Sequence, residues 1–306
     1  MEHALFSILA LSLNAVLMGP WAVDSPLGDL LRLPAQELRA IERKLNRPQR
    51  TLGVRTQRGL LLLVTVLLSA LALGLVINQL HIRVLSIAVL ALLLPVRPTW
   101  DLTSAIGKDL EIKDTATARI ELKDSIWRHY ALLDEYALAR AAIETLAVQF
   151  SEKIVAPLFW YLLLGMPGFL LAKAIYLLKE TLCLPQASNG FTQPAFLLHS
   201  TINFIPSRLA AILWLPMPMF LPSGKSIAAV THVGSAIASQ QTPEQLAVSA
   251  AAAVLGLSLG GPTSVYTQGI WCGTGSAKAS PADIRHGLYL FALLHLFGIV
   301  LLGFCL

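Results

Sequence analysis

The sequence is short of charge. Only 13% of its 306 residues are charged, whereas 55% are hydrophobic. A soluble protein carries about 25% charged residues, so a water-facing surface of ordinary composition is excluded. Cysteine is also scarce. The chain has three, Cys183, Cys272 and Cys305. An odd number argues against a disulfide framework, and their spacing is not that of metal ligands, which argues against a zinc site. The chain also lacks the phosphate-binding glycine loop, the zinc-protease helix motif and the nucleophile elbow.

Long uncharged runs are present instead. Residues 59–77 carry no charge over 19 positions, enough for a helix to cross a hydrocarbon core of about 30 Å. Residues 288–306 form a second run, and residues 154–178 form a third that Gly165-Met166-Pro167-Gly168 interrupts. Shorter apolar runs occupy residues 4–18, 82–96, 205–222 and 246–262. This pattern predicts an all-α, polytopic integral membrane protein with one membrane domain over residues 1–306. The first run has no basic segment before it, so we interpret it as a retained span and not as a signal peptide.

Basic residues predict the orientation. Residues 24–58 carry eight basic and four acidic side chains between the first two spans, which places this loop in the cytoplasm and the N-terminus outside. Residues 97–153 then return to the cytoplasm. Within them, apolar residues at spacings of three and four from Leu132 to Phe150 predict an amphipathic helix with Asp134 as its cap. The side of the loop at 179–204 stays open, because residues 154–178 could span or re-enter.

The remaining charge pattern limits the partners. A net charge of +5 is accounted for by membrane topology and contact with anionic lipid. Aromatic residues do not alternate with the basic ones, so no nucleic-acid partner is expected. The four C-terminal histidines are too scattered for a metal motif, and no metal ligand is predicted. A transporter is less well supported, because Lys173 and His295 are the few ionisable residues inside the spans.

Several short motifs occur in the order and spacing of a known family. They are Ala139-Arg140-Ala141-Ala142-Ile143-Glu144-Thr145, Ile154-Val155-Ala156-Pro157-Leu158-Phe159-Trp160, Gly165-Met166-Pro167-Gly168, Asn203-Phe204-Ile205-Pro206-Ser207-Arg208-Leu209 and Leu259-Gly260-Gly261-Pro262. The chain therefore resembles, over nearly its whole length, the CbiB/CobD family of membrane proteins in cobalamin biosynthesis, the adenosylcobinamide-phosphate synthases.

The resemblance implies an ATP-dependent ligase of the inner membrane. Such an enzyme joins aminopropanol phosphate or ethanolamine phosphate to a propionate of adenosylcobyric acid through an amide bond, with ATP and Mg²⁺ as cofactors. The polar residues that match the family's motifs are Arg128, Arg140, Glu144, Asn203, Arg208 and Asp29. Glu144 is the predicted catalytic carboxylate, and the other five are predicted to bind substrate, with Arg128 and Arg208 as anion clamps. Alternatively, Arg140 and Glu144 form a helix-surface pair and Arg208 extends to the lipid headgroups.

Most of the family's acidic motifs are missing from this sequence. The G-R-D-T pattern reads Trp127-Arg128-His129-Tyr130, E-N reads Val148-Gln149, N-T-x-D reads Tyr176-Leu177-Leu178-Lys179, and D-D-x-x-N reads His199-Ser200-Thr201-Ile202-Asn203. The P-N-A-G-W-P-E stretch has no clear counterpart around Thr242-Pro243-Glu244-Gln245. These losses leave a second hypothesis open: a non-catalytic signalling or assembly protein with membrane-protein partners, as in the AmpE branch of the superfamily.

Overall fold

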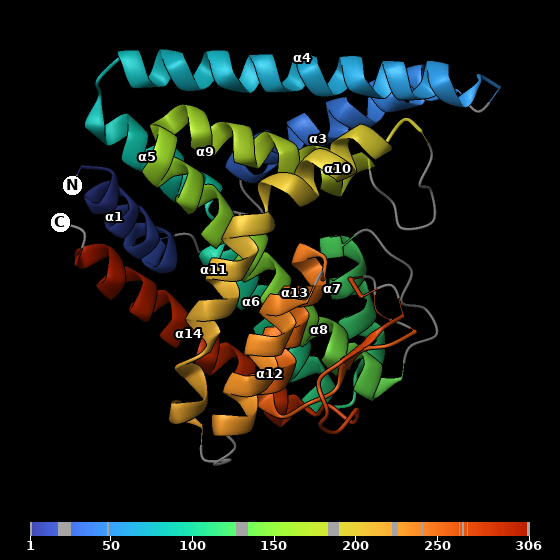
Figure 1. Ribbon diagram of the computed structural model, residues 1–306, viewed down its shortest axis with the longest axis vertical. Coiled ribbons are helices and arrows are strands. Elements are labelled where there is room, and N and C mark those ends of the chain that lie inside the picture. Colours follow the sequence, from blue (N-terminus) through green and yellow to red (C-terminus); the bar gives the residue numbers. More distant parts are fainter. Residues whose placement is uncertain are drawn as a thin grey trace. The chain divides into compact units, whose positions relative to one another are not determined.

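The structure is a computed structural model that describes residues 2–17, 26–47, 49–126, 134–182, 190–221, 226–239, 241–262, 264, 266–267 and 269–304. Nearly all of these residues are helical, as the sequence predicts. The chain divides into two compact units (Figure 1). The first unit comprises Met1–Leu94 and Ala156–Phe204, and the second comprises Pro95–Val155 and Ile205–Leu306.

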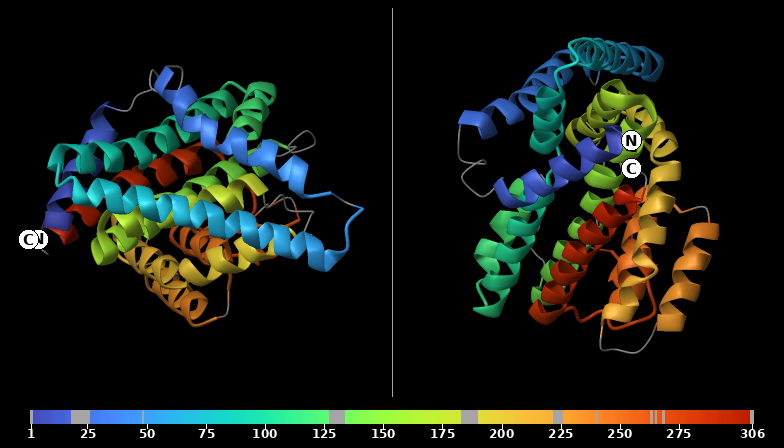
Figure 2. Two further views of the ribbon diagram at one scale, coloured as in Figure 1. Left: turned by 90° about the horizontal axis from the view of Figure 1, so that it is seen from above. Right: turned by 90° about the vertical axis from the view of Figure 1, so that its left-hand side faces the viewer.

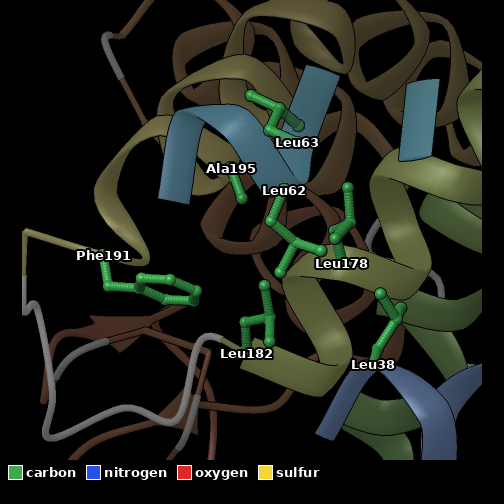
Figure 3. Close-up of a cluster of buried hydrophobic side chains, with 7 residues drawn as sticks. All are labelled: Leu38, Leu62, Leu63, Leu178, Leu182, Phe191 and Ala195. Atoms are coloured by element: carbon green, nitrogen blue, oxygen red, sulfur yellow. The ribbon is translucent and has the colours of Figure 1, made fainter. Parts of the chain in front are cut away.

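Six helices of the described chain build the first unit. They are α1 (Glu2–Leu17), α3 (Pro26–Leu45), α4 (Leu52–Gln79), α5 (Arg83–Leu93), α9 (Ala156–Leu182) and α10 (Gln193–Ile202), and α4 and α9 are the longest of them. Helix α4 lies along α9 and α10. A buried cluster joins α3, α4, α9 and α10 (Figure 3), formed by Leu38, Leu62, Leu63, Leu178, Leu182, Phe191 and Ala195. Burying each of its leucines contributes about 1.5–3 kcal/mol, so this cluster fixes α3 against the two longest helices of the unit.

The motif Gly165-Met166-Pro167-Gly168 bends α9 as predicted. Gly165 has φ +67° and ψ −151°, which is non-helical backbone inside the helix. Such a positive φ strains any residue that carries a Cβ atom, and Pro167 removes a helical hydrogen bond just beyond it. The break also brings α9 against α4, since a Cβ on Gly74 would lie 2.5 Å from Cα of Pro167.

The second unit packs its helices around α8. Its elements are α6 (Val96–Glu111), α7 (Thr115–Ile126), α8 (Glu135–Gln149), the π-helix η1 (Phe150–Val155), α11 (Phe204–Trp214), η2 (Met217–Phe220), α12 (Ser226–Ala238), α13 (Pro243–Leu255), β1 (Leu259–Gly260), β2 (Trp271–Cys272) and α14 (Pro281–Gly303). Helices α6, α7, α13 and α14 all contact α8 (Figure 2). The strands pair antiparallel, with Leu259 opposite Cys272 and Gly260 opposite Trp271.

The lengths of the helices confirm the polytopic membrane fold. Among the described residues, four helical stretches are long and apolar enough to cross a membrane: Leu52–Gln79, Arg83–Glu111, Glu135–Leu182 and Pro281–Gly303. A fifth span results if Gln193–Ile202 and Phe204–Phe220 count as one broken span.

The helix predicted to end near Phe150 is present as α8, but the prediction that it is amphipathic is wrong. Asp134 caps α8 as expected, because its side chain accepts a hydrogen bond from the N–H of Ala137 at 2.8 Å. The exposed polar face that an amphipathic helix would have is absent from the described helix: from Ala137 to Gln149 every residue except Arg140 is buried. The reason is that neighbouring helices surround α8, so its polar side chains point into protein and not into water.

Candidate functional site

Helix α8 carries a carboxylate into the interior of the second unit. Glu144 is 2% exposed. The helix forms locally because Asp134 caps it and the alanines that follow favour helical backbone. The small alanine side chains also let neighbouring helices approach closely. Burying a carboxylate costs several kcal/mol unless hydrogen bonds or positive charge compensate for lost water, so the partners of Glu144 define its role.

Both oxygens of Glu144 accept hydrogen bonds from one glycine-rich segment. The N–H of Gly260 donates to Oε1 at 2.8 Å, and the hydroxyl of Ser264 donates to Oε2 at 2.6 Å. The Ser264 oxygen in turn accepts hydrogen bonds from the N–H groups of Tyr266 and Thr267, at 3.2 and 3.3 Å. Glu144 therefore holds Gly260 directly, and it holds Tyr266 and Thr267 through Ser264.

The glycines of this segment are required by its geometry. Gly260 and Gly261 have φ values of +89° and +79°, which favour glycine. A Cβ on Gly260 would lie 2.3 Å from the carbonyl oxygen of Ile270, and one on Gly261 would lie 2.6 Å from the Trp271 ring. The motif Leu259-Gly260-Gly261-Pro262 is thus a place where two chain segments cross closely. The N–H of Gly260 donates to Glu144 there.

Arg140 lies one turn before Glu144, and its guanidinium contacts other residues of the protein. Its Nη1 donates to the carbonyl of Ala277. Its guanidinium also lies 5.5 Å from the centroid of the Trp271 ring, within cation–π range. Arg140 interacts electrostatically with Glu144 as well. These contacts attach α8 to β2 and to the segment that follows it.

The end of β2 is buried beside this site. Burial raises the pKa of the Cys272 thiol above its ordinary value, despite a hydrogen bond with Ser249 that acts in the opposite direction. Ser249 lies on α13 and donates from its hydroxyl to Oε1 of Gln241 at 3.0 Å. Cys272 is thus a buried side chain of β2, the strand that packs against α13.

Two further carboxylates meet in the same unit. Glu152 lies in η1 and is 2% exposed, and Glu244 lies at the start of α13 and is 6% exposed. Each offers a carboxylate oxygen within 4.8 Å of the other. Positive charge relieves the repulsion between two buried carboxylates, so among the described residues of this unit the pair offers two oxygens suited to a divalent cation.

Local structure explains how each of these carboxylates is placed. The π-helix η1 interrupts the regular helix at Phe150–Val155, and such π turns are frequent at functional sites because they widen the helix. Thr242 and Gln245 form a capping box at the start of α13, with Pro243 in the first turn. Glu244 therefore sits at the positive end of the α13 dipole, which stabilises its charge.

A neutral polar contact lies one residue before η1. Gln149 is buried, and its Oε1 accepts a hydrogen bond from the hydroxyl of Thr99 on α6 at 2.7 Å. Gln149 stands in the position where the family motif has asparagine, so an amide is kept there, and this amide ties α6 to the end of α8.

Two of the six predicted site residues lie together, two lie elsewhere, and the side chains of the last two are not described. Arg140 and Glu144 are brought together around residues 260–277 of the second unit. Asn203 caps α10 in the first unit, where its Nδ2 donates to the carbonyl of His199 at 2.9 Å. Arg208 lies on α11, is partly buried and makes polar or electrostatic contacts of its own. Arg128 lies outside the described residues, and Asp29 lies on α3, where only its backbone is described.

Sequence reasoning missed Glu152 and Glu244. Glu152 stands alone, with Lys153, between two apolar helical segments, and an ionisable residue in such a helix indicates a functional site. Thr242-Pro243-Glu244-Gln245 is a helix-start signal that places Glu244 in the first turn. Both signals were present in the sequence, but only the fold reveals that the two carboxylates meet.

Comparison with known proteins gives a consistent result. Residues 8–291 match the family model described as CobD/Cbib protein. The chain is 31% identical over 226 residues to "Cobalamin biosynthesis protein CobD" of Rhizobium meliloti, covering 69% of this chain and 67% of that one. It is 27% identical over 303 residues to the protein of that name in Rhodobacter capsulatus, covering 95% and 93%. A probable cobalamin biosynthesis protein of Thermococcus kodakarensis matches at 35% over 113 residues, 37% of each chain.

No solved structure matches the chain. The names of these relatives do not favour the alternative of a non-catalytic signalling protein.

Proposed function

Because the chain belongs to the CobD/CbiB protein family, we propose that it forms adenosylcobinamide phosphate in cobalamin biosynthesis. The reaction joins the amine of aminopropanol phosphate or ethanolamine phosphate to a propionate carboxyl of adenosylcobyric acid. An amide bond forms, and ATP supplies the driving force. The family match over residues 8–291 supports the pathway, and the carboxylate pair of Glu152 and Glu244 is the observation that carries the chemistry.

The pair fits Mg²⁺, the metal that the family's reaction implies. Mg²⁺ prefers hard oxygen ligands and is commonly bound by one or two carboxylates together with substrate phosphates and water. Glu152 and Glu244 offer two such oxygens within 4.8 Å of each other. When bound there, Mg²⁺ would neutralise phosphate charge on the nucleotide.

This pair could bind Mg²⁺ although the family's acidic motifs are missing from the chain. A site that has lost several carboxylates can still hold Mg²⁺ if two remain at a suitable separation, because the phosphates supply further oxygens. Arg128 and Arg208 are proposed to hold the anionic substrates, since guanidinium groups bind phosphate and carboxylate through paired hydrogen bonds.

Glu144 is proposed as a positioning residue. Both of its oxygens accept hydrogen bonds, one from Gly260 and one from Ser264, and these bonds support a role in holding the backbone. Its contribution is to keep residues 260–267 in one conformation beside the reacting groups.

The test is growth of a bacterial strain that lacks its cobinamide-phosphate synthase, supplied with cobyric acid. We expect the wild-type chain to restore growth, and Glu152→Gln and Glu244→Gln each to abolish it. Glu37→Gln changes an exposed carboxylate of the first unit and should leave growth intact. Membrane expression of every variant is checked by immunoblot. Absence of growth with well-expressed wild-type chain would contradict the ligase, whereas growth with both variants would contradict only the Mg²⁺ assignment.

A further inference from the structure

The positive charge of this protein is concentrated in one short segment. Residues 37–58 hold seven of the 23 basic side chains and two of the 18 acidic ones, so the rest of the chain carries sixteen of each sign and is neutral. The whole net charge of +5 therefore resides where α3 ends and α4 begins. This concentration of cations makes a strongly anion-attracting surface.

Two of the cations hold the corner between the helices together. Arg55 donates from Nε and Nη2 to Oδ1 of Asn46 at 3.0 and 2.9 Å, and Arg58 donates from Nη1 to the carbonyl of Leu45 at 3.3 Å. These acceptors are neutral, so the bonds shape the corner without cancelling its charge. Glu42 is the nearby acid, and its Oε1 accepts a hydrogen bond from Nδ2 of Asn46 at 3.0 Å.

Four other cations of this corner present exposed side chains: Arg43, Lys44, Arg47 and Arg50. We call them the basic corner. The N-terminus of α4 adds to their field, because Thr51 makes no capping hydrogen bond and the first turn holds no acidic residue. A helix N-terminus in this state carries partial positive charge.

An exposed apolar surface lies on α4 beyond the basic corner, and Arg55, Gln57 and Arg58 interrupt it between Leu52 and Leu60. Leu52 and Leu61 are 66% and 67% exposed, and Leu60, Val64 and Leu68 are exposed as well. Since α4 is long and apolar enough to span the membrane, a position of this surface among the acyl chains would bring the cations at its end to the level of the headgroups. The arrangement matches one molecule class: a negatively charged headgroup on apolar chains.

We propose that the basic corner and the adjoining face of α4 form a binding site for an anionic phospholipid. The phosphate and headgroup contact Arg47 and Arg50, and the acyl chains lie along the exposed leucines of α4. This inference goes beyond the proposed ligase reaction, because it concerns the first unit and requires neither ATP nor a corrinoid.

The experiment is native mass spectrometry of the full-length protein, purified in detergent and titrated with phosphatidylglycerol. Phosphatidylcholine with the same acyl chains and inorganic phosphate are titrated separately. We expect phosphatidylglycerol to bind more tightly than phosphatidylcholine. The double variant Arg47→Gln/Arg50→Gln should lose about thirtyfold in affinity for phosphatidylglycerol, since each cation near an anionic surface contributes about fivefold. Its affinity for phosphatidylcholine should not change.

A matched control removes the same charge elsewhere. Lys113→Gln/Lys278→Gln alters two exposed cations of the second unit and should keep wild-type affinity. Equal losses in both double variants would overturn the site, and displacement of the lipid by millimolar inorganic phosphate would indicate a free-phosphate site instead. If Arg47→Gln/Arg50→Gln does not fold, as judged by its thermal unfolding, Arg43→Gln/Lys44→Gln tests the same corner under the same expectations.

Discussion

Helix α4 of the first unit and helix α8 of the second place their side chains in opposite ways. Leucines of α4 are largely exposed, with Leu61 at 67%, and the helix has no polar side-chain cap. By contrast, α8 is capped by Asp134, is buried on nearly every side and carries Glu144 and Gln149 into the interior. In a membrane the solvent around a helix is apolar, so apolar side chains face outward at no cost and polar ones are stable inside.

This contrast assigns different tasks to the two helices. The outer face of α4 suits lipid, and its opposite side is tightly packed against α9 and α10. The interior around α8 holds the hydrogen-bonded carboxylate Glu144 and, in the π-helix that follows, Glu152. Chemistry that needs charge in a membrane protein is expected where polar groups are enclosed by protein, so the second unit is the place to look for it.

The largest expected effect follows removal of the Glu144 carboxylate. Glu144→Ala leaves the N–H of Gly260 and the hydroxyl of Ser264 without their acceptor. Hydrogen bonds to a charged group contribute about 1.5–3 kcal/mol each, so the free energy of unfolding should fall by about 3–6 kcal/mol. Thermal unfolding in detergent measures the loss, and limited proteolysis should show faster cleavage within residues 257–277.

Two comparison variants make this result specific. Glu144→Gln keeps the shape and one acceptor oxygen and should lose about half as much stability. Glu135→Ala removes a carboxylate from the first turn of the same helix, where it is partly exposed, and should cost well under 1 kcal/mol. If Glu144→Ala unfolds at the wild-type temperature, the buried carboxylate does not hold the glycine-rich segment.

A smaller effect is expected where α4 crosses α9. A Cβ on Gly74 would lie 2.5 Å from Cα and 2.9 Å from N of Pro167. Gly74→Ala must therefore displace backbone, and overpacking of this kind costs about 1–3 kcal/mol. On the same helix, a Cβ on Gly53 meets nothing within 4 Å, so Gly53→Ala should stabilise the helix by up to about 1 kcal/mol. Opposite shifts in the unfolding temperature are the expected outcome, and equal shifts would contradict the crossing.

Much of the fold was predictable because it depends on local rules. Four of the seven apolar runs predicted helices long enough to span, whereas residues 246–262 contain the end of the shorter α13 and strand β1. Asp134 predicted the start of α8, and Gly165 with Pro167 predicted the break in α9. Each of these depends on hydropathy, capping or backbone freedom within a few residues. The family, too, was recognisable from motifs that shape helices.

The surroundings of α8 were not predictable from its periodicity. Apolar residues at spacings of three and four predict one buried face, but they do not reveal that the other face is buried as well. The contacts that decide this are distant in sequence. Arg140 reaches the backbone carbonyl of Ala277, which has no sequence signature, and Glu152 meets Glu244 only after α13 packs into the unit.

The smallest expected effect compares the starts of the two helices. The side chain of Asp134 accepts the N–H of Ala137, and replacing such a cap by alanine costs about 1 kcal/mol. The side chain of Thr51 makes no capping bond to α4, so Thr51→Ala should change stability by a few tenths of a kcal/mol at most. Hydrogen exchange followed by mass spectrometry should show faster exchange in the first turn of α8 in Asp134→Ala, and unchanged exchange at the start of α4 in Thr51→Ala. Equal effects of the two variants would mean that the polar cap does not distinguish the enclosed helix from the lipid-facing one.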